Sequence, residues 1–189
     1  YNHHTSRIAQ LMFLNALEDF IESGTESESE SESADDTRQY ALTIRRMDDA
    51  EITTALRTAE GYPKEIMVRI DERRLFKRAV YVNMTELDAS VAEELGEERK
   101  IKEVVKEISE RAGVPEHYVL VDFQGRKGDE LEESAAKVII GKESRSLRDV
   151  SSLVAMLSRV FQENYKLGVY TPEKYRVDVK RVAEKILWR

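Results

Sequence analysis

The spacing of apolar residues changes once along the chain, at about Lys77, and this change constrains the fold more than any other feature. Before it, apolar residues recur at helical spacing. After it, short runs of β-branched and aromatic residues, typical of strands, alternate with further helical segments. We therefore expect two parts: a helical segment over residues 1–75 and an α+β lobe over residues 76–189.

The elements expected in the second part follow the order β-α-β-β-α-β-α. Two neighbouring strands with a turn between them, over 118–123 and 136–140, are expected to form a hairpin. This order is that of a split βαβ domain, a four-stranded antiparallel sheet with two helices on one face. The predicted fold class is α+β, a helical segment followed by a ferredoxin-like split βαβ domain with an extra C-terminal helix. The other predicted strands cover 78–82 and 167–170, and the predicted helices cover 97–112, 147–161 and 172–187.

An alternating Ser/Glu tract interrupts the helical part. Residues 22–36 contain five Glu and two Asp, which equal the net charge of −7, so the remainder is formally neutral. Mutual repulsion and the lack of apolar residues predict an acidic disordered linker over 22–38. A negatively charged helix is the alternative, disfavoured because Ser is a poor helix former. Without a positive field on the folded remainder, no nucleic-acid partner is expected.

Composition excludes several other classes. No apolar run approaches the length of a membrane helix, and no basic segment precedes an apolar stretch, so we expect neither membrane association nor secretion. The chain has no cysteine, which excludes disulfides, thiolate catalysis and zinc–cysteine sites. These features predict a cytoplasmic protein whose stability comes from packing.

The side chains that could hold a metal are few. The histidines are His3, His4 and His117, and none has the spacing of a metal-binding motif. His117 precedes a predicted strand and is expected to lie in a turn. Asp48 and Asp49 are a candidate carboxylate pair, but their position favours capping of a helix. No catalytic and no metal-binding residue is therefore predicted within this chain.

A cluster of cations lies where the predicted helices give way to strands. Arg73 and Lys77 are four residues apart and share one face if the helix continues that far. They either clamp a phosphate group or pair with Asp71, Glu72 or the acidic tract. Both readings remain open. The whole cluster consists of Arg69, Arg73, Arg74, Lys77 and Arg78.

Three short segments occur in a recognisable order: residues 1–7 before an apolar helix, 47–51 at the start of another, and 73–78 at the end of a third. In order and spacing they resemble the C-terminal half of HD-domain proteins related to dNTP triphosphohydrolases, including the sterile-alpha-motif-and-HD-domain enzyme. The resemblance is good over residues 1–80 and is one of pattern beyond. Because Tyr1 leads directly into a helix, we interpret the sequence as a fragment.

The resemblance implies a metal-dependent phosphohydrolase. In that family two histidines and two aspartates hold a divalent metal, and a metal-bound water attacks phosphorus. Those four ligands lie upstream of the tyrosine that matches Tyr1. The resemblance therefore implies that this chain alone lacks the residues for hydrolysis, while the parent protein is an enzyme. Its implied partners are a nucleotide, the upstream HD domain and further copies in a homo-oligomer.

The resemblance also assigns residues. Tyr1 matches the tyrosine that lines the substrate pocket, while His3 and His4 match a histidine and a lysine near an effector-nucleotide site. Arg73 and Lys77 match basic residues of that same region. His4 thus replaces a permanent cation with an imidazole. The rival hypothesis, from another class, is a non-catalytic ligand-sensing or self-association module built on the ferredoxin-like domain.

Overall fold

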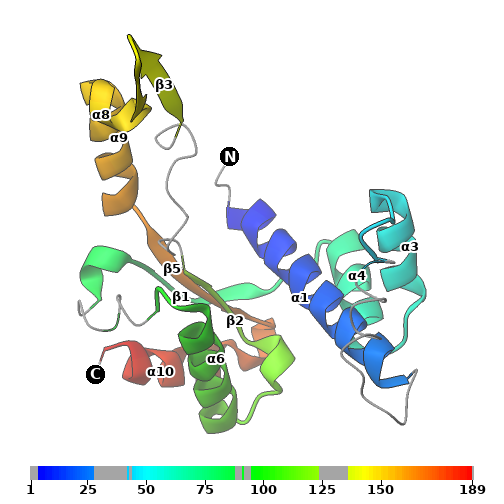
Figure 1. Cartoon of the computed structure of the whole chain (residues 1–189). Helices are drawn as coiled ribbons and strands as arrows, with labels where there is room; N and C mark the ends of the chain where they lie inside the picture. Colours follow the sequence, from blue (N-terminus) through cyan, green and yellow to red (C-terminus); the bar gives the residue numbers. More distant parts are fainter. Residues whose placement is uncertain are drawn as a thin grey trace. The chain divides into compact units, whose positions relative to one another are not determined.

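The computed structural model describes residues 4–27, 42, 44–87, 91, 95–123 and 136–188. It divides the chain into two compact units, Tyr1–Phe76 and Lys77–Arg189. The described part of the first unit is helical, and the second combines helices with antiparallel strands (Figure 1). This confirms the predicted α+β class.

Among the described residues, the first unit contains the helices α1 (His4–Ser27), α3 (Asp49–Thr58) and α4 (Tyr62–Asp71). Helix α1 contacts both α3 and α4. The hydroxyl of Tyr62 donates to Oδ1 of Asn15 at 2.7 Å, which ties α4 to α1. Their apolar faces meet in a small core that contains Ile8, Met12, Ala16, Leu56, Ile66 and Met67.

Helix α3 starts where the sequence predicts. Asp48 is its N-cap, since Oδ1 of Asp48 accepts from the Glu51 amide at 2.8 Å. In return the Asp48 amide donates to Oε2 of Glu51 at 2.8 Å, which completes a capping box. The capping interpretation of Asp48 is confirmed, and its carboxylate has a structural task.

Helix α1 is longer than expected. It continues to Ser27, so residues 22–27, assigned above to the acidic linker, are helical. A helix that is already formed adds one hydrogen bond per residue, which allows it to extend into a sequence of poor intrinsic propensity. The Ser23 hydroxyl adds a bond of 2.8 Å to the Asp19 carbonyl one turn earlier. The rest of the predicted linker, residues 28–38, lies outside the described residues.

A three-stranded antiparallel sheet organises the second unit. Its strands are β1 (Lys77–Asn83), β2 (Leu120–Phe123) and β5 (Lys166–Thr171), in the order β1-β5-β2. Helix α6 (Glu98–Ala112) connects β1 to β2, and β5 enters between them. A βαβ unit with a strand inserted in this way is a split βαβ arrangement.

One face of this sheet is covered by α6 and α10 (Arg176–Leu187), which also contact each other (Figure 1). The second covering helix is thus the C-terminal one rather than the helix predicted over 147–161. Gly168 lies on β5, where an added Cβ would clash with the Tyr170 side chain. The core includes Val80, Val121, Phe123, Leu167 and Val169 of the strands and Ile101, Ile108, Val179, Val182 and Ile186 of the helices.

The predicted four-stranded sheet is not formed by the described residues. β3 (Lys137–Ile140) pairs with β4 (Glu143–Ser146) in a separate two-stranded sheet, and β2 pairs with β5. The expected hairpin between 118–123 and 136–140 is therefore wrong. Gly141 has φ +66° and allows a two-residue turn directly after β3, so β3 turns back onto the polar segment that follows.

The helix expected over 147–161 is broken into α8 (Leu147–Val150) and α9 (Ser152–Glu163). Ser151 stands at the break, and its Oγ accepts from the Val154 amide at 3.4 Å. A serine that caps a new helix ends the preceding one, because its own backbone is extended. The described residues also form three short 3₁₀ turns: η1 (Met84–Glu86), η2 (Glu116–Tyr118) and η3 (Glu173–Tyr175). Within the described part of the chain, every helix is too short or too polar to cross a membrane.

Candidate functional site

The five predicted site residues do not form one described cluster. Tyr1 and His3 lie outside the described residues. His4 is the first residue of α1, and its side chain is exposed. Arg73 belongs to the first compact unit, whereas Lys77 opens the second. The surroundings of Arg73 and Lys77 therefore differ.

Arg73 lies beyond the end of α4 in an unusual backbone conformation. Its φ is +58°, the only positive value at a non-glycine among the described residues. The Arg73 amide donates to the Ile70 carbonyl at 3.0 Å, and the Arg74 amide donates to the Arg69 carbonyl at 2.7 Å. This left-handed termination ends the helix before Lys77. The expectation that Arg73 and Lys77 share a helical face is wrong.

The acidic neighbours of Arg73 bind other arginines. Asp71 accepts two hydrogen bonds from Arg57, of 2.9 Å from Nε and 2.8 Å from Nη2. The Arg57 hydrogen bond holds the pKa of Asp71 below its ordinary value. Glu72 pairs with Nε of Arg74 at 2.5 Å. Within the described ranges, the exposed side chains of Arg73 and Lys77 have no salt bridge, so pairing with Asp71 or Glu72 is wrong.

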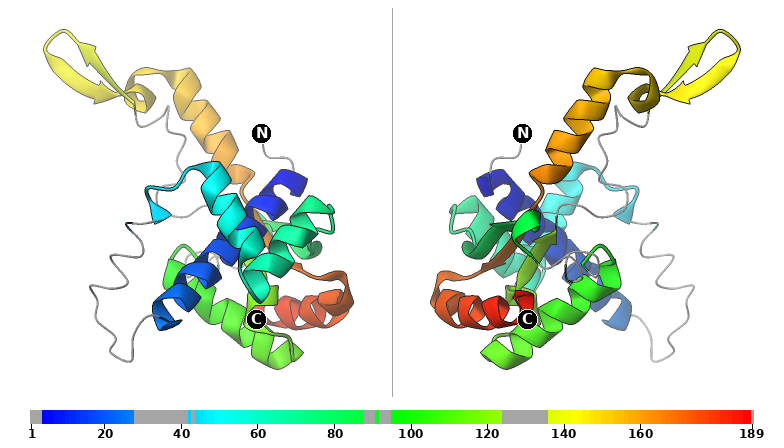
Figure 2. Two further views of the ribbon diagram at one scale, coloured as in Figure 1. Left: turned by 90° about the vertical axis from the view of Figure 1, so that its right-hand side faces the viewer. Right: turned by 90° about the vertical axis from the view of Figure 1, so that its left-hand side faces the viewer.

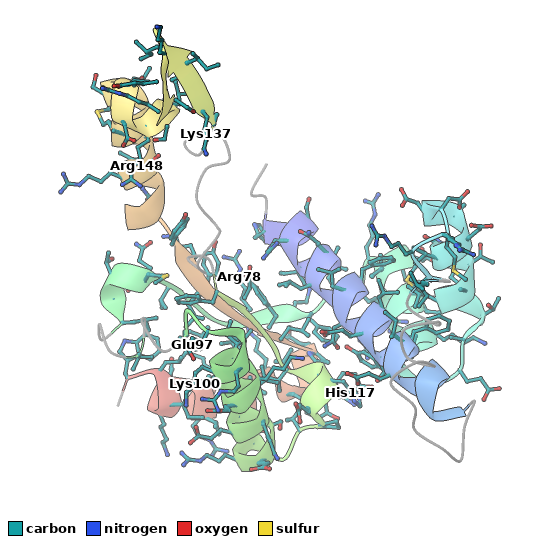
Figure 3. The ribbon with its side chains drawn as sticks, viewed as in Figure 1. Arg78, Glu97, Lys100, His117, Lys137 and Arg148 are labelled. Atoms are coloured by element: carbon teal, nitrogen blue, oxygen red, sulfur yellow. The ribbon has the colours of Figure 1, made fainter. Side chains whose placement is uncertain are left out.

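The start of β1 gathers cations from two distant segments. The Arg78 guanidinium lies 4.8 Å from the ring centroid of Tyr81, a cation–π contact, and Figure 3 labels Arg78 on this strand. Nε of Arg176, at the start of α10, donates to the Arg78 carbonyl at 2.9 Å. Lys77 faces Thr171 in the strand register. Arg176 was not predicted from the sequence, because no local pattern reveals a contact across 98 residues.

The described residues do not fit a metal site. No group of three or more histidine, aspartate or glutamate side chains in these parts of the chain is placed to hold an ion. His117, labelled in Figure 3, lies in η2, the turn where it was expected. The centroids of its ring and of the Tyr118 ring are 4.4 Å apart.

Helix α9 has an exposed apolar stripe that was not predicted from the sequence. Leu153, Met156, Leu157 and Val160 are all exposed, whereas Ser158 is buried. The sequence predicts an amphipathic helix here, but periodicity does not tell whether the apolar face meets the core or the solvent. An apolar stripe on the outside is typical of a contact surface.

Known proteins provide three findings. No curated protein matches the sequence. A solved phosphohydrolase from Bacteroides thetaiotaomicron is similar with a TM-score of 0.40 and 16% identity, over 90% of this chain and 45% of that one. The chain thus spans less than half the length of that protein. The family described as HD associated region matches residues 1–188.

Proposed function

Because this chain belongs to the family of HD associated regions, we propose that it is the C-terminal part of a metal-dependent HD-type (deoxy)nucleotide phosphohydrolase. The match over nearly the whole chain carries the proposal. An upstream HD domain would supply the metal ligands, and its metal would activate the attacking water. The residues described here would contribute a wall of the substrate pocket, effector-nucleotide contacts or an oligomer interface. Tyr1, His3 and His4 keep their proposed nucleotide roles, and the cytoplasm is the proposed compartment.

Arg73 and Lys77 are the proposed effector contacts that the structure makes accessible. Both side chains are exposed, and neither is neutralised by an ion pair within the described ranges. An anion such as a nucleotide phosphate suits a cation of this kind, since it gains a charge-assisted hydrogen bond. Because Arg73 and Lys77 belong to different compact units, each is proposed as a separate contact with a nucleotide phosphate.

Titration of a deoxynucleoside triphosphate into the protein translated from the complete reading frame, and into its variants, measures these contacts. We expect Arg73→Ala and Lys77→Ala each to weaken binding at least tenfold, since a charge-assisted contact contributes about 1.5 to 3 kcal/mol. Lys142→Ala, an exposed lysine in the β3–β4 turn, is the matched control and should leave affinity unchanged. Two salt concentrations separate specific contacts from nonspecific attraction. Equal affinity of all four proteins would contradict both proposed phosphate contacts and leave the hydrolase assignment standing.

The catalytic part of the proposal has its own assay. Residues 1–189 alone should not hydrolyse any dNTP with Mg²⁺ or Mn²⁺, whereas the protein translated from the complete reading frame should. Chelator-sensitive turnover by residues 1–189 would refute the assignment of catalysis to an upstream domain. An inactive full-length protein without an HD sequence would favour the rival, a non-catalytic module.

Self-association is a second candidate function for this chain, and one observation favours it. The exposed apolar side chains of α9 offer a surface that a partner can bury.

A further inference from the structure

The hydroxyl of Thr171, the last residue of β5, is buried without a hydrogen-bond partner. Thr171 is 0% exposed, and its Oγ1 meets no donor or acceptor in the described part of the chain. Burial removes a hydroxyl from water, so an unpaired one costs free energy that folding does not recover. Most buried polar groups are paired, and each exception requires a physical explanation. A ligand that accepts a hydrogen bond from Oγ1 would provide one.

The strand register places Lys77 beside this hydroxyl. Lys77 is the first residue of β1 and lies directly opposite Thr171. Directly opposite residues of an antiparallel pair point to the same face of the sheet, with Cβ atoms about 4.5 to 5.5 Å apart. The Lys77 side chain is exposed and has no salt bridge within the described ranges. It can therefore turn towards a ligand without breaking an ion pair.

The face on which these two side chains lie is the one that α6 and α10 cover. Thr171 follows the core residue Val169 by two positions, and side chains two apart on a strand share a face. Figure 2 shows the end of β5, in dark orange, leading directly into α10, in red. Nε of Arg176, which opens α10, donates to the carbonyl of Arg78, the residue after Lys77. The start of α10 is thus fastened next to the pair of Lys77 and Thr171.

Among the cations at this end of the sheet, Lys77 carries the charge that is not balanced. Nη1 of Arg176 lies 3.6 Å from Oε1 of Glu173. The Arg78 guanidinium lies over the ring of Tyr81. An ammonium without a counter-ion beside a hydroxyl without an acceptor fits an oxyanion, whose oxygens accept from both. A phosphate group has several such oxygens, so a single group can bond the two side chains at once.

We propose that Thr171 and Lys77 together bind one phosphate group, with the hydroxyl donating to one oxygen and the ammonium to another. Because the hydroxyl is covered in this structure, binding includes a movement of the Lys77 side chain towards the phosphate. The inference rests on the proposed function, in which Lys77 contacts a nucleotide phosphate. It adds Thr171 as a second contact to the same phosphate group.

Two substitutions of Thr171 test the hydroxyl, in the protein translated from the complete reading frame. Thr171→Val replaces the hydroxyl by a methyl group and should weaken binding of a deoxynucleoside triphosphate about tenfold, since a charge-assisted hydrogen bond is lost. The melting temperature without nucleotide should stay unchanged or rise, because the hydroxyl that is removed had no partner. Thr171→Ser retains the hydroxyl and should retain the affinity.

Ser158→Ala is the matched control. Ser158 of α9 is 5% exposed, and its Oγ also lacks a hydrogen-bond partner among the described residues. This variant should keep the melting temperature, like Thr171→Val, but should leave the affinity for the nucleotide unchanged. If Ser158→Ala weakened binding as much as Thr171→Val does, the loss would not come from the contact at Thr171, and the inference would be wrong.

Inorganic tripolyphosphate separates a phosphate contact from a contact with the sugar or the base. Thr171→Val should weaken binding of tripolyphosphate by the same factor as binding of the nucleotide, because both proposed bonds go to phosphate oxygens. A loss seen with the nucleotide alone would contradict the phosphate contact.

Comparison with Lys77→Ala distinguishes failure of this inference from failure of the proposed function. If Lys77→Ala weakens binding and Thr171→Val does not, the hydroxyl makes no contact and only this inference fails. If Thr171→Val lowers the melting temperature as well as the affinity, the hydroxyl has a structural role, and again only this inference fails. If neither variant binds more weakly, or if the wild-type protein binds no nucleotide, the proposed nucleotide contact at Lys77 fails together with it.

Discussion

Helices α9 and α10 are of equal length, amphipathic and part of the same unit, yet they place their apolar faces oppositely. In α10 five apolar side chains are buried against the sheet and α6, whereas four apolar side chains of α9 are exposed. The same sequence period thus produced a core helix in one place and an exposed stripe in the other. An amphipathic pattern predicts a buried face but not whether its partner belongs to the same chain.

The strongest test of this difference truncates one leucine in each helix. Leu187→Ala in α10 should lower the free energy of unfolding by about 2 to 5 kcal/mol, because Leu187 is fully buried. Leu153→Ala in α9 should cost less than about 0.5 kcal/mol in the monomer. Urea denaturation at low protein concentration, followed by fluorescence of Trp188, the single tryptophan, measures both. Losses of similar size would show that α9 is a core helix.

A pair of glycine substitutions extends the comparison to the strands. Gly168→Ala should destabilise the three-stranded sheet by about 1 to 3 kcal/mol, since the new Cβ would overlap the Tyr170 ring. Gly141→Ala meets no atom within 4 Å, but its φ of +66° should cost about 1 to 2 kcal/mol in the β3–β4 hairpin. A double-mutant cycle with Tyr170→Ala isolates the steric part. If Gly168→Ala costs the same with and without the Tyr170 ring, the close packing is not the cause.

A single side chain at the start of α9 allows this helix to be perturbed locally. Ser151→Ala removes the side-chain acceptor for the Val154 amide and should cost about 1 kcal/mol. Hydrogen exchange should accelerate in the first turn of α9, while the amides of α10 keep their protection. Faster exchange in both helices would mean that they unfold as one unit.

The smallest change in the free energy of unfolding is expected on the solvent-exposed face of α10. Lys180 and Glu184 form an exposed i, i+4 pair at 3.7 Å. Glu184→Gln should change the free energy of unfolding by roughly 0.3 to 0.5 kcal/mol, and less at high salt. Thermal unfolding at two ionic strengths measures this change. If Glu184→Gln lowered the free energy of unfolding as much as Leu187→Ala does, this surface ion pair would stabilise α10 as strongly as a buried leucine.

Features set by neighbouring residues were predictable from the sequence. Helix α6 was expected over 97–112 and observed over Glu98–Ala112, because its apolar stripe is regular and Gly113 ends it with φ +67°. The N-cap at Asp48 follows from the same local chemistry. Each of these signals lies within a few residues of the element it specifies.

Features set by distant residues or by unusual backbone were not predictable. Strand β4 consists of Glu-Ser-Arg-Ser, which has no apolar alternation, so only its pairing with β3 defines it. At the candidate site, the left-handed Arg73 carries no sequence signal, because glycine or asparagine usually occupies such a position. Arg176 reaches β1 from the other end of the unit. Tertiary structure therefore determines the pairing of β4 with β3, the end of α4 and the neighbours of Arg78.

The central place of β5 also dictates an order of events during synthesis. β1 and β2 both pair with β5 and emerge from the ribosome well before it. Until β5 is translated, no strand is present that can pair with both β1 and β2. The apolar face that these strands share with α6 also stays exposed until α10 is translated. Loop closure over such sequence distances makes folding slow and exposes the nascent chain to aggregation. The second unit should therefore fold only once β5 and α10 have been translated, whereas the helices of the first unit can pack much earlier.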